Sequence, residues 1–364
     1  MSPQQLVSYI APGAPATRRP AAGDLQFLRP EIGFTPKWYH QALGVDFGER
    51  WHSDPIYRRQ MVLLMRKEIN RRFPGNKIGK IDPQEEVLDL LTGVYGACTI
   101  AAMFGVPIRF DKEQWPASEH IYLTDEEMAE LKPVDPANNL FFQSIMEQVD
   151  RIAEMEGKVV GFINWQGVLN NAQRLRGQQV FLDMLIEPEM TFNLLECVTK
   201  TMIDAAKLLH QRQKLSGVTY SFFTVSNCLV NMLSPDLYHE FILPFDKQIA
   251  DAFDSIGIHN CAWNATPYLA DYASVPKVGY IDMGIDSDLK RASTFFPDSR
   301  RALMYTPMDL ANKSIIEIRK DLEYTAANYG PCDIVAADIE AATPDSRVSD
   351  LMQLCSDISD LYKE

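Results

Sequence analysis

Hydrophobic and polar positions alternate between strand-like and helix-like segments from about residue 141 onward. Short apolar runs rich in β-branched residues predict strands, and longer stretches with apolar positions three and four apart predict helices. The predicted strands are 159–163, 218–225, the run containing His259, 278–282, 301–305 and 332–338. The predicted helices are 141–155, 187–209, 234–253, 310–328 and a last one that begins at Thr343-Pro-Asp345.

The N-terminal third is less regular. A first strand is predicted from Ile32, running into a loop by His40. Asp54 and Pro55 predict the start of a helix that reaches Phe73, because aspartate caps helices and proline fits the first helical position. A second helical region is predicted at 84–105 and a short strand at 108–110. Residues 1–24 are rich in Pro, Ala and Gly and are expected to form an arm without its own core.

Buried-looking strands that alternate with helices predict a parallel sheet. Six strands are clear, and two more fit the N-terminal third, which would complete a single α/β domain, a (β/α)8 TIM barrel, over residues 25–364. A doubly wound open sheet is the alternative. No Gly-x-Gly-x-x-Gly follows a predicted strand, which argues against a dinucleotide-binding fold.

Composition narrows the classes of partner. The chain is 46% hydrophobic and 23% charged, with a net charge of −14 and no basic stripe, so neither nucleic acid nor an anionic membrane surface is expected as a partner. No apolar run has the length of a membrane span, and residues 1–20 lack the apolar core of a signal peptide. Six widely spaced cysteines indicate reduced thiols in a cytoplasmic protein.

The most chemically suggestive pair is His259 and Cys261, which are separated by one residue near the end of a predicted strand. Residues i and i+2 of a strand point to the same face, so both side chains are expected to face one spot. Imidazole nitrogen and thiolate sulfur are ligands that zinc prefers. The alternative is a buried cysteine beside a hydrogen-bonded core histidine.

A catalytic zinc site needs a third protein ligand, which should come from a neighbouring strand end. Cys332 begins the last predicted strand and is therefore expected at the opposite end of the barrel. Asp338 ends that strand and is the predicted third ligand, with Glu340 as second choice. The alternative role for Asp338 is to cap a short turn.

Other candidate site residues lie where a barrel places catalytic groups, at or beyond strand ends. Glu49 and His52 belong to a charged segment that could close over the mouth, although a surface salt bridge is the alternative. Asn227 and Asp282 are expected to hydrogen-bond metal ligands. The catalytic candidates are Glu49, His52 and Asn227, and the substrate-binding candidates are Trp165, Trp263, Asp282 and Tyr305.

Several motifs together resemble the uroporphyrinogen decarboxylase superfamily over residues 140–360. They are Gly177 within 170–188, Leu233-Ser-Pro-Asp-Leu237, Leu243-Pro-Phe245, His259-x-Cys261 and Thr343-Pro344. The resemblance implies a (β/α)8 barrel. True decarboxylases carry an arginine-rich N-terminal loop and a late histidine before the last Thr-Pro. This chain has Phe34-Thr-Pro-Lys-Trp-Tyr-His40 and Ala336-Ala-Asp-Ile-Glu340 at those places, without either feature.

The chain looks more similar to the zinc methyltransferases of this superfamily, which share His-x-Cys and carry a further cysteine near the end of the last strand. This resemblance implies Zn2+, a small methylated substrate or thiol, and a partner protein that carries a corrinoid (cobalamin). A homodimer is also considered. One alternative is a decarboxylase of a tetrapyrrole or smaller acid, with carboxylates held by Arg50, Arg58 and Arg174. Another is a non-catalytic corrinoid- or ligand-binding barrel.

Overall fold

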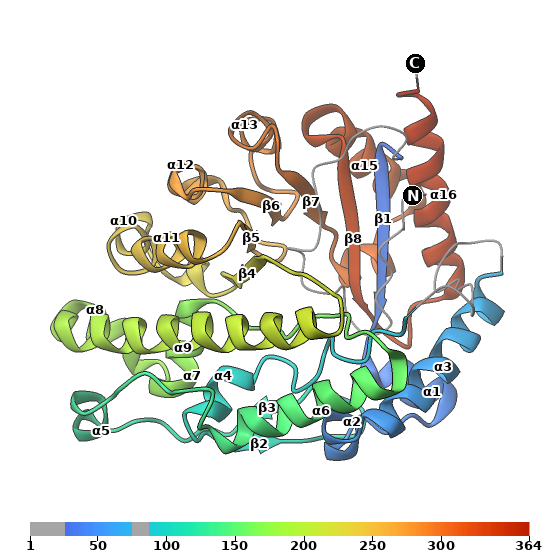
Figure 1. Cartoon of the computed structure of the whole chain (residues 1–364). Coiled ribbons are helices and arrows are strands. Elements are labelled where there is room, and N and C mark those ends of the chain that lie inside the picture. The colour runs from blue at the N-terminus through green and yellow to red at the C-terminus, as the bar shows by residue number, and fades with distance from the viewer. Residues whose placement is uncertain (1–25, 75–86, 364) are drawn as a thin grey trace.

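The computed structural model describes residues 26–74 and 87–363. The predicted arm (1–24) and the beginning of the predicted helical region 84–105 lie outside these residues. The described chain forms one parallel six-stranded sheet in the order β1-β8-β7-β6-β5-β4, with helices around it (Figure 1). Its strands are β1 (Leu28–Phe34), β4 (Phe222–Ser226), β5 (Ser255–His259), β6 (Val278–Met283), β7 (Arg300–Met304) and β8 (Cys332–Ile339).

The strand order follows the chain from β4 to β8 and then brings β1, the N-terminal strand, against β8, as Figure 1 shows. The register pairs Leu28 with Cys332 and Ile32 with Ala336. Beyond this point Phe34 pairs with Ile339, so β8 carries one extra residue, as in a β-bulge. This irregularity lies beside Asp338, whose φ of 55° is in the left-handed region.

Two segments without regular strand structure, 88–97 and 158–166, line the same central cavity as the ends of β4 to β8. The predicted strand at 159–163 is therefore wrong, although the segment lies where a barrel strand would lie. Its backbone groups bond to side chains instead of a neighbouring strand. Val159 N donates to Ser216 Oγ at 2.9 Å, Phe162 N donates to Thr92 Oγ1 at 3.1 Å, and Gln213 Nε2 donates to the Gly161 carbonyl at 2.9 Å.

Helices surround the sheet and carry most of the apolar core. The longer ones are α3 (Pro55–Arg72), α6 (Leu140–Glu156), α9 (Pro188–Leu215), α11 (Leu243–Ala252), α15 (Ile315–Tyr329) and α16 (Asp345–Asp360). The shorter ones are α1 (Pro36–Leu43), α2 (Glu49–Ser53), α4 (Thr99–Met103), α5 (Asp125–Ala129), α7 (Val168–Arg176), α8 (Gln179–Ile186), α10 (Pro235–Leu237), α12 (Leu269–Ser274), α13 (Leu289–Phe295) and α14 (Pro307–Asn312). No described helix combines the length and apolar character needed to cross a bilayer.

Local sequence explains where several helices begin and end. The Asp54 side chain accepts hydrogen bonds from Ile56 N and Tyr57 N, which confirms the predicted start of α3. The predicted loop before His40 is wrong, because Thr35 caps α1 by accepting from Trp38 N. The predicted helix at 84–105 is also wrong for most of its described part. Left-handed φ values at three positions, Gly93, Tyr95 and Gly96, interrupt the helix, and only α4 forms.

Alternation along the strands divides the sheet into two faces. Ile281, Leu303 and Ile334 belong to the large core packed under the helices. Tyr280, Ala302 and Val335 form a small inner cluster. Tyr280 and Val335 also line the central cavity. The period-2 pattern of the strands therefore directs one set of side chains into the barrel, where the site lies.

Candidate metal centre

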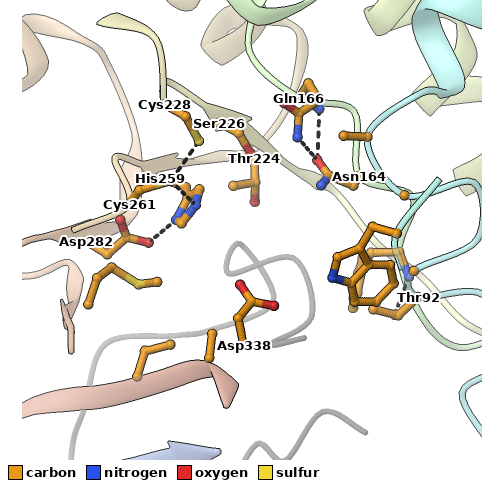
Figure 2. A pocket seen from close by; sticks show the side chains of 18 of the residues that line it. Thr92, Asn164, Gln166, Thr224, Ser226, Cys228, His259, Cys261, Asp282 and Asp338 are labelled. Carbon is orange, nitrogen blue, oxygen red and sulfur yellow. Dashed lines mark hydrogen bonds and ion pairs between the residues drawn. The ribbon is translucent and has the colours of Figure 1, made fainter. Parts of the chain in front are cut away.

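A cavity of about 570 Å3 opens at the carboxyl ends of the strands. Its lining includes aromatic rings, among them those of Trp165 and Tyr305, and polar side chains, several of which are labelled in Figure 2. Three potential metal ligands, Cys228, His259 and Cys261, gather on one wall. Their ligand atoms all lie within 4.8 Å of one another, and no other such group of three occurs within 26–74 and 87–363.

The three donor atoms are in direct contact. Cys228 Sγ lies 2.8 Å from Cys261 Sγ, and Cys261 Sγ lies 3.2 Å from His259 Nε2. The predicted meeting of His259 and Cys261 is thus observed, but not by two residues of one strand. β5 ends at His259, and Cys261 follows in a turn with φ 58°. The left-handed turn returns the cysteine side chain towards the histidine.

Glycine at 284 lets this turn pack closely. A Cβ at Gly284 would lie 2.0 Å from the Ala262 carbonyl oxygen, a separation that no real contact allows. Gly284 N also donates to the Trp263 carbonyl at 3.1 Å. The turn after β5 is therefore held against the chain just after β6 by backbone contact.

Cys228 reaches the group from the neighbouring strand. Ser226, the last residue of β4, pairs with His259, and Asn227 N donates to the His259 carbonyl at 2.7 Å. Sequence reasoning missed Cys228 as a ligand. Its signal was available, because Cys228 follows a predicted strand just as His259 ends one. The sequence did not show that the strands before Cys228 and before Cys261, β4 and β5, are neighbours in the sheet.

Asp282 at the end of β6 orients the histidine. Its Oδ2 lies 2.6 Å from His259 Nδ1 and also accepts from Tyr280 Oη at 3.0 Å. Its Oδ1 accepts from Asn260 N at 2.7 Å. The Asp282 carboxylate holds the Nδ1 proton of His259 and so orients the ring, which directs Nε2 at Cys261.

The surroundings of Cys228 and Cys261 favour one negative charge that is shared between their two sulfur atoms. The pKa of Cys228 is lowered to about 5 because the Cys261 thiol donates a hydrogen bond to it, with further help from His259. The pKa of Cys261, the donor, is raised by the same bond and by burial. Burial alone would lower the pKa of His259, but the Asp282 carboxylate and Cys261 hold it well above its usual value.

These residues fit a zinc ion by the chemistry of their donors. Two sulfurs and an imidazole are a soft set that zinc accepts, and a site with three protein ligands leaves a fourth position for a substrate or water. The carboxylate on the far side of the histidine is the partner that zinc-binding histidines usually have. The group also faces the cavity, so a small molecule can reach it.

Asp338, the predicted third ligand, lines the cavity but is not a member of the ligand group. Figure 2 shows its carboxylate rising from β8, apart from Cys228, His259 and Cys261. Cys228 therefore takes the place that the sequence had suggested for Asp338. Partial desolvation by the cavity walls raises the pKa of the Asp338 carboxyl, with a further increase from Glu340 and an opposing contribution from Trp115. Glu340, the second choice, is exposed and does not line the cavity.

The remaining predicted site residues divide into two sets. Trp165, Asp282 and Tyr305 line the cavity as expected. The hydroxyl of Tyr305 is engaged outside it, donating to Asp321 at 2.9 Å, which leaves the ring to form the wall. Trp263 is not part of the lining and packs edge-on against Tyr268, with ring centroids 5.4 Å apart.

The three predicted catalytic residues lie outside the cavity lining. Glu49 is exposed on α2. His52 is buried on the same helix, where Nδ1 accepts from Tyr95 N at 2.9 Å, and burial together with Arg58 lowers its pKa to about 3. Asn227 is buried behind Cys228 and donates to Asp246 at 2.9 Å. The idea of a charged loop over the mouth was wrong, because this segment folds into a helix.

The lining also includes residues that the sequence did not connect with the candidate metal group formed by Cys228, His259 and Cys261. Trp115 and Thr92 come from the irregular N-terminal third, and Arg174 comes from α7. Arg174 had been considered only as a carboxylate-binding group for a decarboxylase. No periodic pattern marks the other two, since they lie in segments without regular structure.

Comparison with known proteins agrees with the fold. The family model for uroporphyrinogen decarboxylase (URO-D) matches residues 86–303, more than half of the chain. The chain belongs to the uroporphyrinogen decarboxylase family. The match includes all three residues of the candidate metal group, whereas Asp338 lies beyond it.

A structural relative extends the similarity to nearly the whole molecule. A methyltransferase from Methanosarcina mazei superposes with a TM-score of 0.63 at 16% sequence identity, covering 96% of each chain. At this identity the likeness establishes the shared fold. No curated protein sequence matches this member of the uroporphyrinogen decarboxylase family.

Proposed function

We propose that this member of the uroporphyrinogen decarboxylase family is a zinc-dependent methyltransferase. It would move a methyl group between a small methylated substrate or thiol and a corrinoid protein. The observation that carries the proposal is the group of Cys228, His259 and Cys261 on the wall of the cavity. Two thiols and one oriented imidazole form a metal site that remains open on the substrate side.

Cys228, His259 and Cys261 would hold the ion. A bound zinc ion supplies Lewis acidity, which stabilises negative charge on a substrate sulfur, oxygen or nitrogen atom as a methyl group is transferred. Asp282 keeps the Nδ1 proton of His259 in place and so keeps Nε2 available for the metal. The rings of Trp165 and Tyr305 line the cavity, and they would limit the access of water to the reacting atoms.

The cavity is less suited to a tetrapyrrole with many carboxylates. Of the three arginines considered for that role, only Arg174 lines it, and no other arginine or lysine of the described chain does. Arg58 is buried and donates to the carbonyls of Leu90 and Trp51. Arg50 pairs with Asp54 at 3.3 Å on the surface. A substrate with one carboxylate suits a cavity whose described lining has a single arginine and no lysine better than a tetrapyrrole with many carboxylates does.

The test is metal content and methyl transfer in a matched pair of cysteine variants. Cys261→Ser should lose stoichiometric zinc in elemental analysis and lose methyl transfer between methylcobalamin and a thiol, followed by the cobalamin absorption spectrum. Cys197→Ser is the control, because Cys197 lies on α9 and does not line the cavity. It should keep both properties. Full zinc occupancy in Cys261→Ser would contradict the proposal.

A further inference from the structure

Arg174 lies on the wall of the cavity, and no acidic residue of the described chain pairs with it. It is the only arginine or lysine in that lining among residues 26–74 and 87–363. Its guanidinium makes two hydrogen bonds within the described chain, both through Nη1, to Gln166 Oε1 at 3.5 Å and to the Asn170 carbonyl at 3.2 Å. No described carboxylate lies within ion-pair distance of it.

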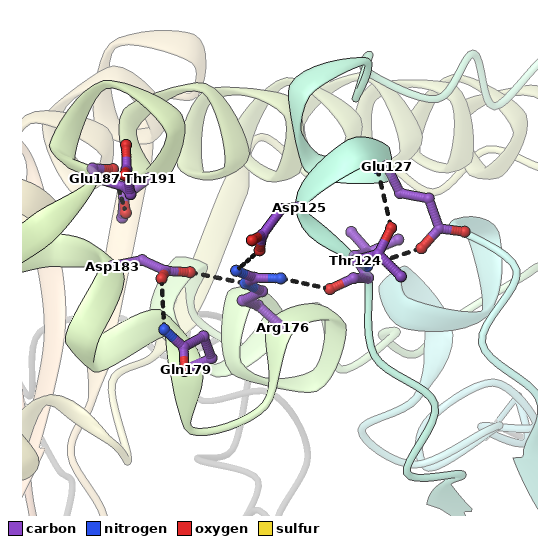
Figure 3. Close-up of polar contacts among 9 residues, drawn as sticks. Thr124, Asp125, Glu127, Arg176, Gln179, Asp183, Glu187 and Thr191 are labelled. Atoms are coloured by element: carbon purple, nitrogen blue, oxygen red, sulfur yellow. Dashed lines mark hydrogen bonds and ion pairs between the residues drawn. The ribbon is translucent and has the colours of Figure 1, made fainter.

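The neighbouring arginine on the same helix shows the contrast. Arg176 is fully engaged, as Figure 3 shows. It donates to Asp183 Oδ2 at 2.7 Å, to the Leu123 carbonyl at 2.7 Å and to Asp125. Its role is to join α7 to α8 and α5. Arg174, two residues earlier, points to the other side of α7 and leaves Nε and Nη2 without a partner in the described chain.

Arg174 is held in place by a polar network along one face of α7. Asn170 and Arg174 are four residues apart and lie on the same face of this helix, whereas Gln166 precedes the helix with a φ of 61° and contacts both of them. Asn170 Nδ2 donates to Gln166 Oε1 at 2.9 Å, and Gln166 Nε2 donates to Asn164 Oδ1 at 2.9 Å. Asn170 Oδ1 also accepts from Leu229 N at 3.2 Å, which ties this face to the segment that carries Cys228.

A half-buried cation without a counter-ion is costly, because burial disfavours its charged form. Burial lowers the pKa of Arg174, and the acidic groups that oppose this effect are only the thiols of Cys98 and Cys228. An arginine remains charged in such a place, and its planar fork of donors suits a carboxylate or a similar oxyanion. Within residues 26–74 and 87–363, no anion satisfies Nε and Nη2 of the guanidinium.

We propose that Arg174 binds an anionic group of the substrate and that the substrate is a small organic acid. The acid would carry its thiol or methylated atom at the opposite end from a carboxylate or comparable oxyanion. With the anion on Arg174, the other end faces the wall that holds Cys228, His259 and Cys261. This inference rests on the proposed function for the role of that wall, whereas the anion site itself depends only on Arg174 and its network.

The experiment compares two thiols of equal length, 3-mercaptopropionate and 3-mercapto-1-propanol, by isothermal titration calorimetry on the zinc-loaded protein. Wild type should bind the carboxylate about tenfold more tightly, because hydrogen bonds to a charged partner are stronger than those to an alcohol. In Arg174→Gln this preference should disappear, and Arg174→Lys should keep part of it. Arg291→Gln is the charge-matched control, since Arg291 is exposed on α13, and it should behave as wild type.

Two results would overturn the inference. One is equal affinity of wild type for the two thiols, including no measurable binding of either. The other is a preference for the carboxylate that is as large in Arg174→Gln as in wild type. This result would count against the inference whether or not the variant still binds zinc. Repeating the titration with 3-methoxypropionate on chelator-treated protein separates this inference from the proposed function. If chelator-treated wild type binds 3-methoxypropionate more tightly than chelator-treated Arg174→Gln does, the anion site is supported even if wild type contains no zinc.

Discussion

At the scale of single residues, one carboxylate, that of Asp282, orients the histidine of the candidate metal group (Cys228, His259 and Cys261). Asp282 is fully buried and accepts from His259, Tyr280 and the backbone of Asn260. It therefore fixes the tautomer of the histidine and the start of the turn that carries Cys261. The sequence suggested Asp282 as a hydrogen-bond partner of the metal ligands, and the geometry agrees.

Asp282→Asn should weaken zinc binding about 10-fold to 100-fold, because an amide at this position can donate to Nδ1 and present the wrong tautomer of His259. Competition with a chromophoric chelator measures the change. Asp338→Asn is the matched control, since it removes a carboxylate from the same cavity but outside the ligand group. Loss of zinc in Asp338→Asn would restore Asp338 as a ligand.

A second buried carboxyl makes stability depend on pH. Burial raises the pKa of Asp246 to about 6, although Asn227 and Tyr238 both donate to it. The unfolded chain releases this proton near pH 4 and the folded chain only near pH 6. The free energy of unfolding should therefore fall as pH rises through this interval, by on the order of 3 kcal/mol.

Urea unfolding at pH 4 and at pH 7 tests this prediction. Asp246→Asn should flatten this part of the pH dependence, because the amide does not titrate. Asp251→Asn is the control on the same helix, as Asp251 is exposed. An unchanged pH dependence in Asp246→Asn would show that other groups cause it.

At the scale of elements, the metal group depends on how two strand ends meet. β4 and β5 are neighbours in register, and the turn after β5 rests on Gly284 after β6. The strands themselves could be predicted, since β-branched runs ending in polar residues are visible in the sequence. The segment 159–163 shows where strand prediction from sequence fails. Its composition is that of a strand, but its backbone hydrogen bonds go to side chains.

Gly284→Ala should lower the free energy of unfolding by about 1–3 kcal/mol, since the new methyl group meets the Ala262 carbonyl and the turn must shift. Zinc affinity should fall with it, because that turn carries Cys261. Gly279→Ala is the comparison. Its Cβ would meet only the side chain of Ser255, whose hydroxyl can rotate away. Equal losses in the two variants, measured by urea unfolding, would refute this explanation.

At the scale of the whole molecule, the metal group joins strands that are packed into one barrel-like body. Binding of an ion to the folded state alone stabilises the entire domain by mass action. Free zinc at about a thousand times its dissociation constant should raise the free energy of unfolding by about 4 kcal/mol. Differential scanning calorimetry of chelated and zinc-loaded protein measures this. Cys228→Ser should show little increase, and an increase equal to that of wild type would exclude Cys228 as a ligand.

The sequence by itself determined the class of the fold and the pair at the centre of the site. Strand and helix periods, and the candidate ligands His259 and Cys261, depend on neighbours in the chain, so they can be recognised locally. Only the tertiary structure decided that Cys228 joins them in place of Asp338, that His52 is buried away from the cavity, and that Arg174 faces it. These outcomes depend on which strands are adjacent and which side of a helix faces inward, and packing of the whole chain fixes both.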